Sequence, residues 1–207
     1  MLFTKSAVIA FLSATIVTAA PTNNVEARGT AKYDDDCKKD FDNKWKNDDW
    51  EKNEKIFYFN KEIIVKAGPG NVVNNSNVAV PGQPGGRGIF KFGINVEENT
   101  ICYNITLNGV TGNYMSPALT ATHIHEGIKG RAGPPRLAFP NPTGPDSKRV
   151  SYGCLTGPFR TGINATGTTT DTGASFHVRQ IVANPAGFFC DTHTAAFPAG
   201  AIRGQLA

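Results

Sequence analysis

Two short segments of the chain contain histidines at spacings that suit a shared binding site. The first reads Thr-His-Ile-His-Glu-Gly and places His123 and His125 two positions apart. Residues two apart on a β-strand project from the same face, so both imidazoles would lie side by side while Ile124 enters the core. Two neighbouring imidazoles can bind one metal ion. Histidines that hydrogen-bond to loops, or that are exposed at a strand end, have the same spacing, so both interpretations stand.

The second segment contains Asp191 and His193, which are also two positions apart. If its strand lies beside the first one, three imidazoles converge, and Asp191 orients a ring nitrogen from behind the ligands. Neutral imidazoles suit copper or zinc, and an open position on the metal would support chemistry there. The sequence therefore offers His123, His125 and His193 as candidate metal ligands.

A structural role for the same residues is the alternative. In it, His193 hydrogen-bonds across to the strand of His123, and Arg203 holds the C-terminal strand through its guanidinium donors. The remaining histidine, His177, lies between two apolar residues and is expected to be solvated on a strand.

Motifs of common enzyme classes are incomplete in this chain. Residues 171–173 spell the Asp-Thr-Gly of aspartic proteases, but that chemistry needs two carboxylates that share a proton, and the sequence has no second copy. We therefore assign 171–174 to a turn. A Gly-x-Ser-x-Gly nucleophile elbow and a Gly-Lys-Ser/Thr phosphate loop are also absent from the sequence. The lack of a complete catalytic set favours a non-enzymatic protein.

Short runs of β-branched and aromatic residues follow Lys55 and are separated by Gly, Pro and Asn. This texture is typical of an all-β domain. Many short strands with turn signals between them predict a β-sandwich or barrel with Greek-key connections. The expected strands are 56–65, 88–96, 100–107, 153–159, 174–182, 187–194 and 200–206.

The N-terminus carries the marks of export. Lys5 precedes an apolar run over 7–20 that is too short to span a bilayer. Small residues at Val17 and Ala19 predict cleavage after Ala19, so residues 1–19 form a signal peptide. Residues 20–55 are dense in mixed charge and form a predicted arm or linker, and residues 56–207 form the β domain. No later stretch is apolar enough for a membrane span, so we expect a secreted protein.

Export would allow the cysteines to form disulfides and three sequons to be glycosylated. Four cysteines in an oxidising compartment favour disulfides over metal thiolates, and the sequence leaves all three connectivities open. The Asn-x-Ser/Thr sequons predict N-glycosylation at Asn74, Asn104 and Asn164. The formal net charge of +4 comes without a basic patch, so no nucleic-acid partner is expected.

Two longer blocks, residues 121–142 and 181–206, resemble the CHRD domain, the module named for the extracellular protein chordin. The resemblance spans about residues 57–207 and matches the single-copy secreted form, because the cysteine-rich growth-factor-binding repeats of chordin are absent. In that form Cys102 and Cys154 resemble a recurring pair, which leaves Cys190 to pair with Cys37 or to remain free, and we favour the pairing with Cys37. The shared elements are His-Ile-His-x-Gly at 123–127, Gly-Pro at 133–134, Asn-Pro at 184–185, His-Thr at 193–194 and Pro-x-Gly-x-Ile-Arg-Gly-Gln-Leu at 198–206.

A looser similarity is to copper/zinc superoxide dismutases. His123, His125 and Glu126 match the His-x-His-Glu strand of their copper site, whereas the bridging histidine and the zinc-ligand cluster are absent. The two resemblances imply an immunoglobulin-like or superoxide-dismutase-like fold. The expected function is a non-enzymatic extracellular module that binds a protein, a glycan or a matrix component. The alternative is a histidine-based copper or zinc protein with redox activity.

Overall fold

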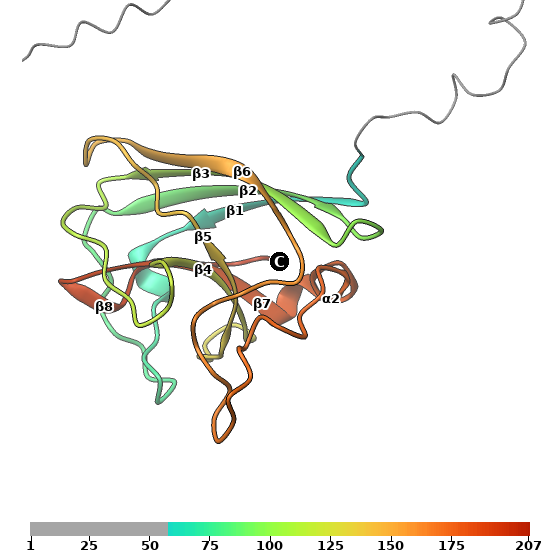
Figure 1. The fold of residues 1–207 in the computed structure, drawn as a ribbon. Helices are drawn as coiled ribbons and strands as arrows, with labels where there is room; N and C mark the ends of the chain where they lie inside the picture. The colour runs from blue at the N-terminus through green and yellow to red at the C-terminus, as the bar shows by residue number, and fades with distance from the viewer. Residues whose placement is uncertain (1–57) are drawn as a thin grey trace, which may run out of the picture. The chain divides into compact units, whose positions relative to one another are not determined.

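The structure is a computed structural model that describes residues 58–207. The predicted signal peptide (1–19) and charged arm (20–55) lie outside the described residues. In the described part, two four-stranded antiparallel sheets form a sandwich around one hydrophobic core (Figure 1). The all-β sandwich predicted from the sequence is confirmed.

The first sheet has the strand order β1-β2-β3-β6. Its strands are β1 (Lys61–Ala67), β2 (Arg87–Asn95), β3 (Thr100–Asn108) and β6 (Arg149–Thr156). Side chains alternate between the two faces, so that Ile63 and Val65 are buried while Ile64 between them is exposed. On β3, Ile101 and Ile105 point into the core, as their spacing predicted. One face of this sheet is therefore a wall of the core, and the other faces outward.

The second sheet has the strand order β5-β4-β7-β8. Its strands are β4 (Thr122–Glu126), β5 (Pro135–Phe139), β7 (Phe188–Thr194) and β8 (Phe197–Gln205). Ile124, Cys190 and Ile202 are fully buried and belong to the core. Because successive residues of a strand alternate in direction, the neighbours of Ile124 and Cys190 along β4 and β7 point to the opposite face. The histidines of both segments lie there.

One edge of the sandwich is closed by backbone hydrogen bonds between the sheets. The N–H of Gly68, directly after β1, donates to the carbonyl of Arg203 on β8 at 3.0 Å, and the N–H of Arg203 donates back at 3.1 Å. A Cβ atom on Gly204 would lie 2.5 Å from a methyl carbon of Val65. Only glycine lets the two strands approach this closely.

Short helical segments in the described residues are η2 (Pro69–Asn71), α2 (Arg179–Ala183) and η3 (Pro185–Gly187). The strand predicted over 174–182 is wrong, because Val178 and Ile181 are buried three positions apart in a helical turn. A short apolar run does not distinguish a strand from a buried helix. His177 lies in the turn before α2, where its Nδ1 accepts the N–H of Arg179 at 3.1 Å.

Some strand boundaries also differ from the predicted ones. β1 begins at Lys61 rather than at 56, and β6 covers 149–156 rather than 153–159. β5 is absent from the expected strands and begins within the segment Gly133-Pro134-Pro135. Its first residue is Pro135 at the edge of the sheet, a position where a strand tolerates the missing N–H.

The predicted disulfide between Cys102 and Cys154 is confirmed. Cys102 and Cys154 lie opposite each other in the β3–β6 register and form a disulfide, as the resemblance implied. Cys190 is a free cysteine whose side chain is fully buried in the core. Cys37, the partner favoured for Cys190, lies outside the described residues, so the pairing of these two cysteines stays a prediction.

The three sequons differ in their surroundings. Asn104 and Asn164 are exposed. Asn74 is half-buried, and its Oδ1 accepts the N–H groups of Ser76 at 2.9 Å and Val78 at 3.0 Å. Between residues 58 and 207, no helix has the length and apolarity needed to cross a membrane.

Candidate metal centre

β4 and β7 are hydrogen-bonded neighbours, and their register assembles the site. His123 lies directly opposite Asp191 in the antiparallel pair. His125 is two residues along β4 from His123, and His193 is two residues along β7 from Asp191, so all four share the face that points away from the core. The adjacency of the two histidine segments, which the sequence left open, is therefore present.

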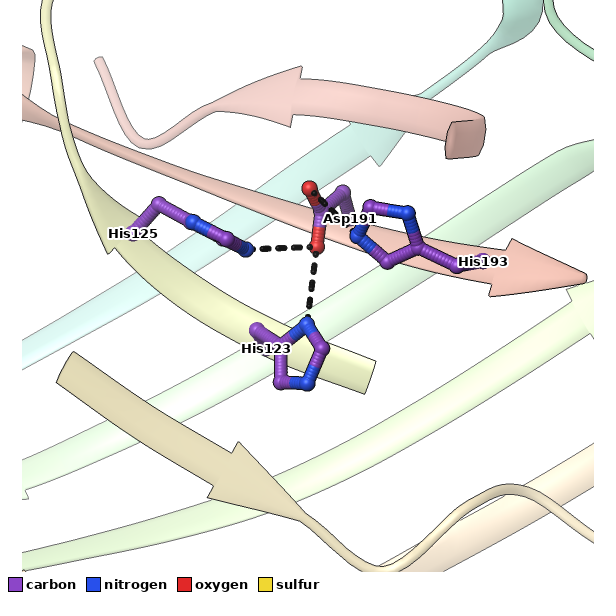
Figure 2. A group of neighbouring side chains, drawn as sticks. All are labelled: His123, His125, Asp191 and His193. Carbon is purple, nitrogen blue, oxygen red and sulfur yellow. Dashed lines mark ion pairs between the residues drawn. The ribbon is translucent and has the colours of Figure 1, made fainter. Parts of the chain in front are cut away.

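The three imidazoles surround the Asp191 carboxylate (Figure 2). Asp191 Oδ1 lies 3.5 Å from His123 Nδ1 and 3.2 Å from His125 Nε2, and Oδ2 lies 3.2 Å from His193 Nε2. One candidate ligand atom from each of the four residues lies within 4.8 Å of the others. Asp191 therefore lies among the imidazoles. The sequence had predicted a position behind them.

Each imidazole is held from behind by a backbone carbonyl. His123 Nε2 lies 2.7 Å from the oxygen of Thr120, and His125 Nδ1 lies 2.8 Å from the oxygen of Gly133. His193 Nδ1 lies 2.9 Å from the oxygen of Pro198. A carbonyl only accepts hydrogen bonds, so the ring nitrogen that faces it carries the proton. In a neutral imidazole, the nitrogen that faces Asp191 then carries a lone pair.

Acceptors consequently face one another at the centre of the cluster. The Nδ1 of His123, the Nε2 of His125 and the Oδ1 of Asp191 are buried without a hydrogen-bond partner. Buried polar groups without partners are uncommon, and each one calls for an explanation. A cation that accepts the lone pairs, either protons on the rings or a metal ion between them, would satisfy all of these atoms.

Burial and charge set the protonation of the cluster. Burial alone would raise the pKa of the Asp191 carboxyl, but the nearby charges of His125 and His193 hold it well below its usual value. Burial lowers the pKa of His123 and outweighs the attraction of Asp191. Burial acts in the same direction on His193, but there the charge of Asp191 outweighs it and raises the pKa. The cluster therefore holds one carboxylate and at least one neutral imidazole near neutral pH.

The spacing of these atoms fits a small transition-metal ion. A tetrahedral ion with bonds of about 2.0 to 2.1 Å separates its ligand atoms by roughly 3.3 Å. The distances of 3.5 and 3.2 Å from Asp191 Oδ1 to His123 and His125, and of 3.2 Å from Oδ2 to His193, lie close to that value, and all four ligand atoms lie within 4.8 Å of one another. Three imidazole nitrogens and one carboxylate oxygen form a ligand set that suits zinc or copper.

A stack of side chains supports His125. The ring of Phe189 lies parallel to its imidazole, with centroids 4.8 Å apart and planes 3° apart. The guanidinium of Arg203 covers the same phenyl ring at 3.3 Å from the centroid. Arg203 Nη2 also donates to the carbonyl of Arg131 at 2.5 Å. Arg203 therefore anchors the loop before β5 and orders the site, in addition to its backbone contacts with Gly68.

Two acidic residues that the sequence singled out lie in other networks. Glu126, the third residue of the superoxide-dismutase-like segment, pairs with Arg136 at 2.7 Å and is not in the cluster. Asp171 lies in a turn, as expected, and its carboxylate accepts the N–H groups of Gly162 at 2.7 Å and Gly173 at 2.8 Å. Of the His-x-His-Glu segment, only the two histidines belong to the site.

Sequence reasoning did not find the groups that position the ligands. Phe189 has the same parity along β7 as Asp191 and His193, which is the signal that could have placed it on their face. The C-terminal Gln205 also has a defined role: its Nε2 donates to the carbonyls of Gly127, Ala186 and Phe188 at 2.9, 2.8 and 2.7 Å. These bonds hold together the loops next to β4 and β7.

The fold and the site define an all-β sandwich domain with a His₃Asp cluster between the two central strands of one sheet. A family model described as "CHRD domain" matches residues 71–206. The chain therefore belongs to the CHRD-domain family, and the matched range includes the whole cluster and the Cys102–Cys154 disulfide. CHRD domains occur in extracellular proteins. Comparisons with curated proteins and with solved structures found no match.

Proposed function

We propose that the chain is a secreted CHRD-domain protein that binds one zinc or copper ion through His123, His125, Asp191 and His193. One observation carries this proposal: three imidazoles, each with one ring nitrogen against a backbone carbonyl, direct their other nitrogens at one buried carboxylate. Carbonyl hydrogen bonds behind the imidazoles are the usual way in which proteins orient histidine ligands of metals.

The ligand set favours a structural metal site. Zinc sites with four protein ligands are structural, whereas catalytic sites keep a position open for water or substrate. A bound ion at this place would cross-link β4 to β7. The residues of the chain orient the rings, keep the carboxylate ionised and exclude water, which supports a non-enzymatic role.

Metal analysis of the secreted protein tests the proposal. Wild type, prepared without affinity metal resins and dialysed against metal-depleted buffer, should contain close to one equivalent of zinc or copper. His123→Ala should lose the metal, whereas His177→Ala should retain it, because His177 lies outside the cluster. Metal-free wild type that binds neither added zinc nor added copper would contradict the proposal.

A role in binding an extracellular protein, glycan or matrix component is the second candidate. Its support is membership of an extracellular type of domain family and a cavity of about 500 Å³ that polar side chains line in part. Side-chain amides line this cavity at Asn75, Asn77 and Asn164 and can hydrogen-bond to hydroxyl groups. Binding of the purified protein to arrays of matrix proteins and cell-wall polysaccharides tests this role. Loss of the captured ligand in Asn77→Leu would support it, and equal capture by that variant would contradict it.

A further inference from the structure

The outward face of the first sheet carries a row of exposed residues across all four strands. The register aligns Ile64 with Lys91, Lys91 with Asn104, and Asn104 with Tyr152. Ile64 is 67% exposed and Tyr152 is 77% exposed. The row therefore places the open ring of Tyr152 directly beside Asn104 on the outward face of the sheet.

Asn104 lies in the middle of this row and is the acceptor of a sequon. Its side chain is exposed, and Thr106, the third residue of the sequon, lies on the same face. Asn74 differs, because its amide oxygen already accepts two backbone N–H groups. Asn104 therefore presents its amide on a rigid strand, next to an aromatic ring on the neighbouring strand.

We propose that Asn104 carries an N-linked glycan whose first N-acetylglucosamine packs on the ring of Tyr152. Residues directly opposite in an antiparallel pair have Cβ atoms about 4.5 to 5.5 Å apart, so a sugar joined to Asn104 starts beside that ring. One face of a pyranose ring presents C–H groups, which pack against an aromatic face and remove apolar surface from water. Tyr152 makes no hydrogen bond within residues 58–207 that would hold it elsewhere.

The neighbouring surface is consistent with a covered face. A hollow of about 300 Å³ borders Asn104 on the side away from Tyr152, and Phe59, Ile64 and Gly93 line it. The Cys102–Cys154 disulfide joins β3 and β6 two pairs along from Asn104 and Tyr152 and fixes their register. In the folded domain the asparagine and the tyrosine are therefore held side by side whether or not a sugar is attached.

The test uses the full chain secreted from a yeast that adds high-mannose glycans. Peptide mass mapping should find Asn104 occupied. Thr106→Ala, which removes the sequon, should lower Tm by about 2 °C relative to Thr106→Ser, which keeps it. In a Tyr152→Ala background this difference should vanish. Trimming the glycan to one N-acetylglucosamine with an endoglycosidase should leave Tm unchanged, because the first sugar makes the contact.

Thr166→Ala provides the matched control, because it removes the sequon of Asn164. Its effect on Tm should be the same in the wild-type background and in the Tyr152→Ala background. An unoccupied Asn104 would overturn the proposal. A Thr106→Ala effect of equal size in both backgrounds would overturn it as well. A wild-type protein that dimerises through this face, shown by loss of the dimer in Tyr152→Ala, would assign the face to a second copy of the chain instead.

Discussion

Replacing Asp191 with asparagine distinguishes metal binding from a purely hydrogen-bonded histidine cluster. The change keeps the shape of the side chain, removes its charge and adds an NH₂ donor. Without metal, the inward nitrogen of His123 and the Oδ1 of Asp191 have no hydrogen-bond partner. The amide introduced by Asp191→Asn can donate to one of the inward nitrogens, but the substitution also removes the carboxylate charge that is attracted to His125 and His193.

The expected change in stability is much larger with metal than without it. Without metal, the new hydrogen bond and the lost attraction to His125 and His193 oppose each other, so the variant should differ from wild type by less than about 1 kcal/mol, or roughly 3 °C in Tm. Free zinc at about 100 times its Kd stabilises a binding protein by about 2.7 kcal/mol. The variant lacks the anionic ligand, so its Tm in zinc should lie about 5 to 10 °C below that of zinc-loaded wild type.

Thermal denaturation followed by circular dichroism, with excess EDTA and with zinc on the same preparation, measures both effects. Asp171→Asn is the control, because that carboxylate accepts backbone N–H groups far from any candidate ligand and its loss should lower Tm equally in both buffers. If Asp191→Asn also lowered Tm equally with and without zinc, the cluster would be an ion-paired structural network, and the reasoning from unpartnered lone pairs would be wrong.

Three further predictions concern the surroundings of the site and the rest of the fold. Phe189→Leu removes the ring stacked on His125 and should weaken zinc binding about tenfold by calorimetry, whereas an unchanged Kd would show that the stack does not orient the ligand. For Asp171, burial raises the pKa, but hydrogen bonds from backbone N–H groups outweigh it and lower the pKa below 3.8. Its contribution to stability is therefore complete above the unfolded value and is lost as pH falls through the folded one. The difference in urea midpoint between wild type and Asp171→Asn should accordingly shrink from about pH 6 to about pH 2, and a constant difference would contradict this assignment. Replacing Cys102 and Cys154 together by serine opens a loop with a sequence separation of 52 and should cost about 4 kcal/mol in urea denaturation, while a loss under about 1 kcal/mol would show that the bridge adds little.

The sequence predicted the candidate ligands because their chemistry is local. The period of two along a strand places His123 with His125 and Asp191 with His193 wherever those strands lie in the fold. The sequence did not predict that Asp191 is central, because this depends on the β4–β7 register, in which His123 faces Asp191. A shift of one residue would have moved the two histidine pairs to opposite faces.

The wrong predictions have physical causes of the same kind. The apolar residues Val178 and Ile181 need burial, and either a strand or a helical turn provides it. For Cys190, the sequence could not indicate burial, because its place in the core depends on how β7 packs against the other sheet. Local sequence patterns indicate which residues must be buried, and tertiary packing decides which structural element buries them.

The pairing of β4 with β7 also determines when the site can exist during folding. Its ligands come from positions about 70 residues apart in the chain, and the chain crosses between the two sheets more than once in that interval. Contacts between distant residues form late, because the entropy of closing long loops has to be overcome first. A metal would therefore bind a domain that has already folded rather than guide its folding. The ion would stabilise the folded sheet by cross-linking β4 to β7. A protein exported without metal should fold first and acquire the ion afterwards.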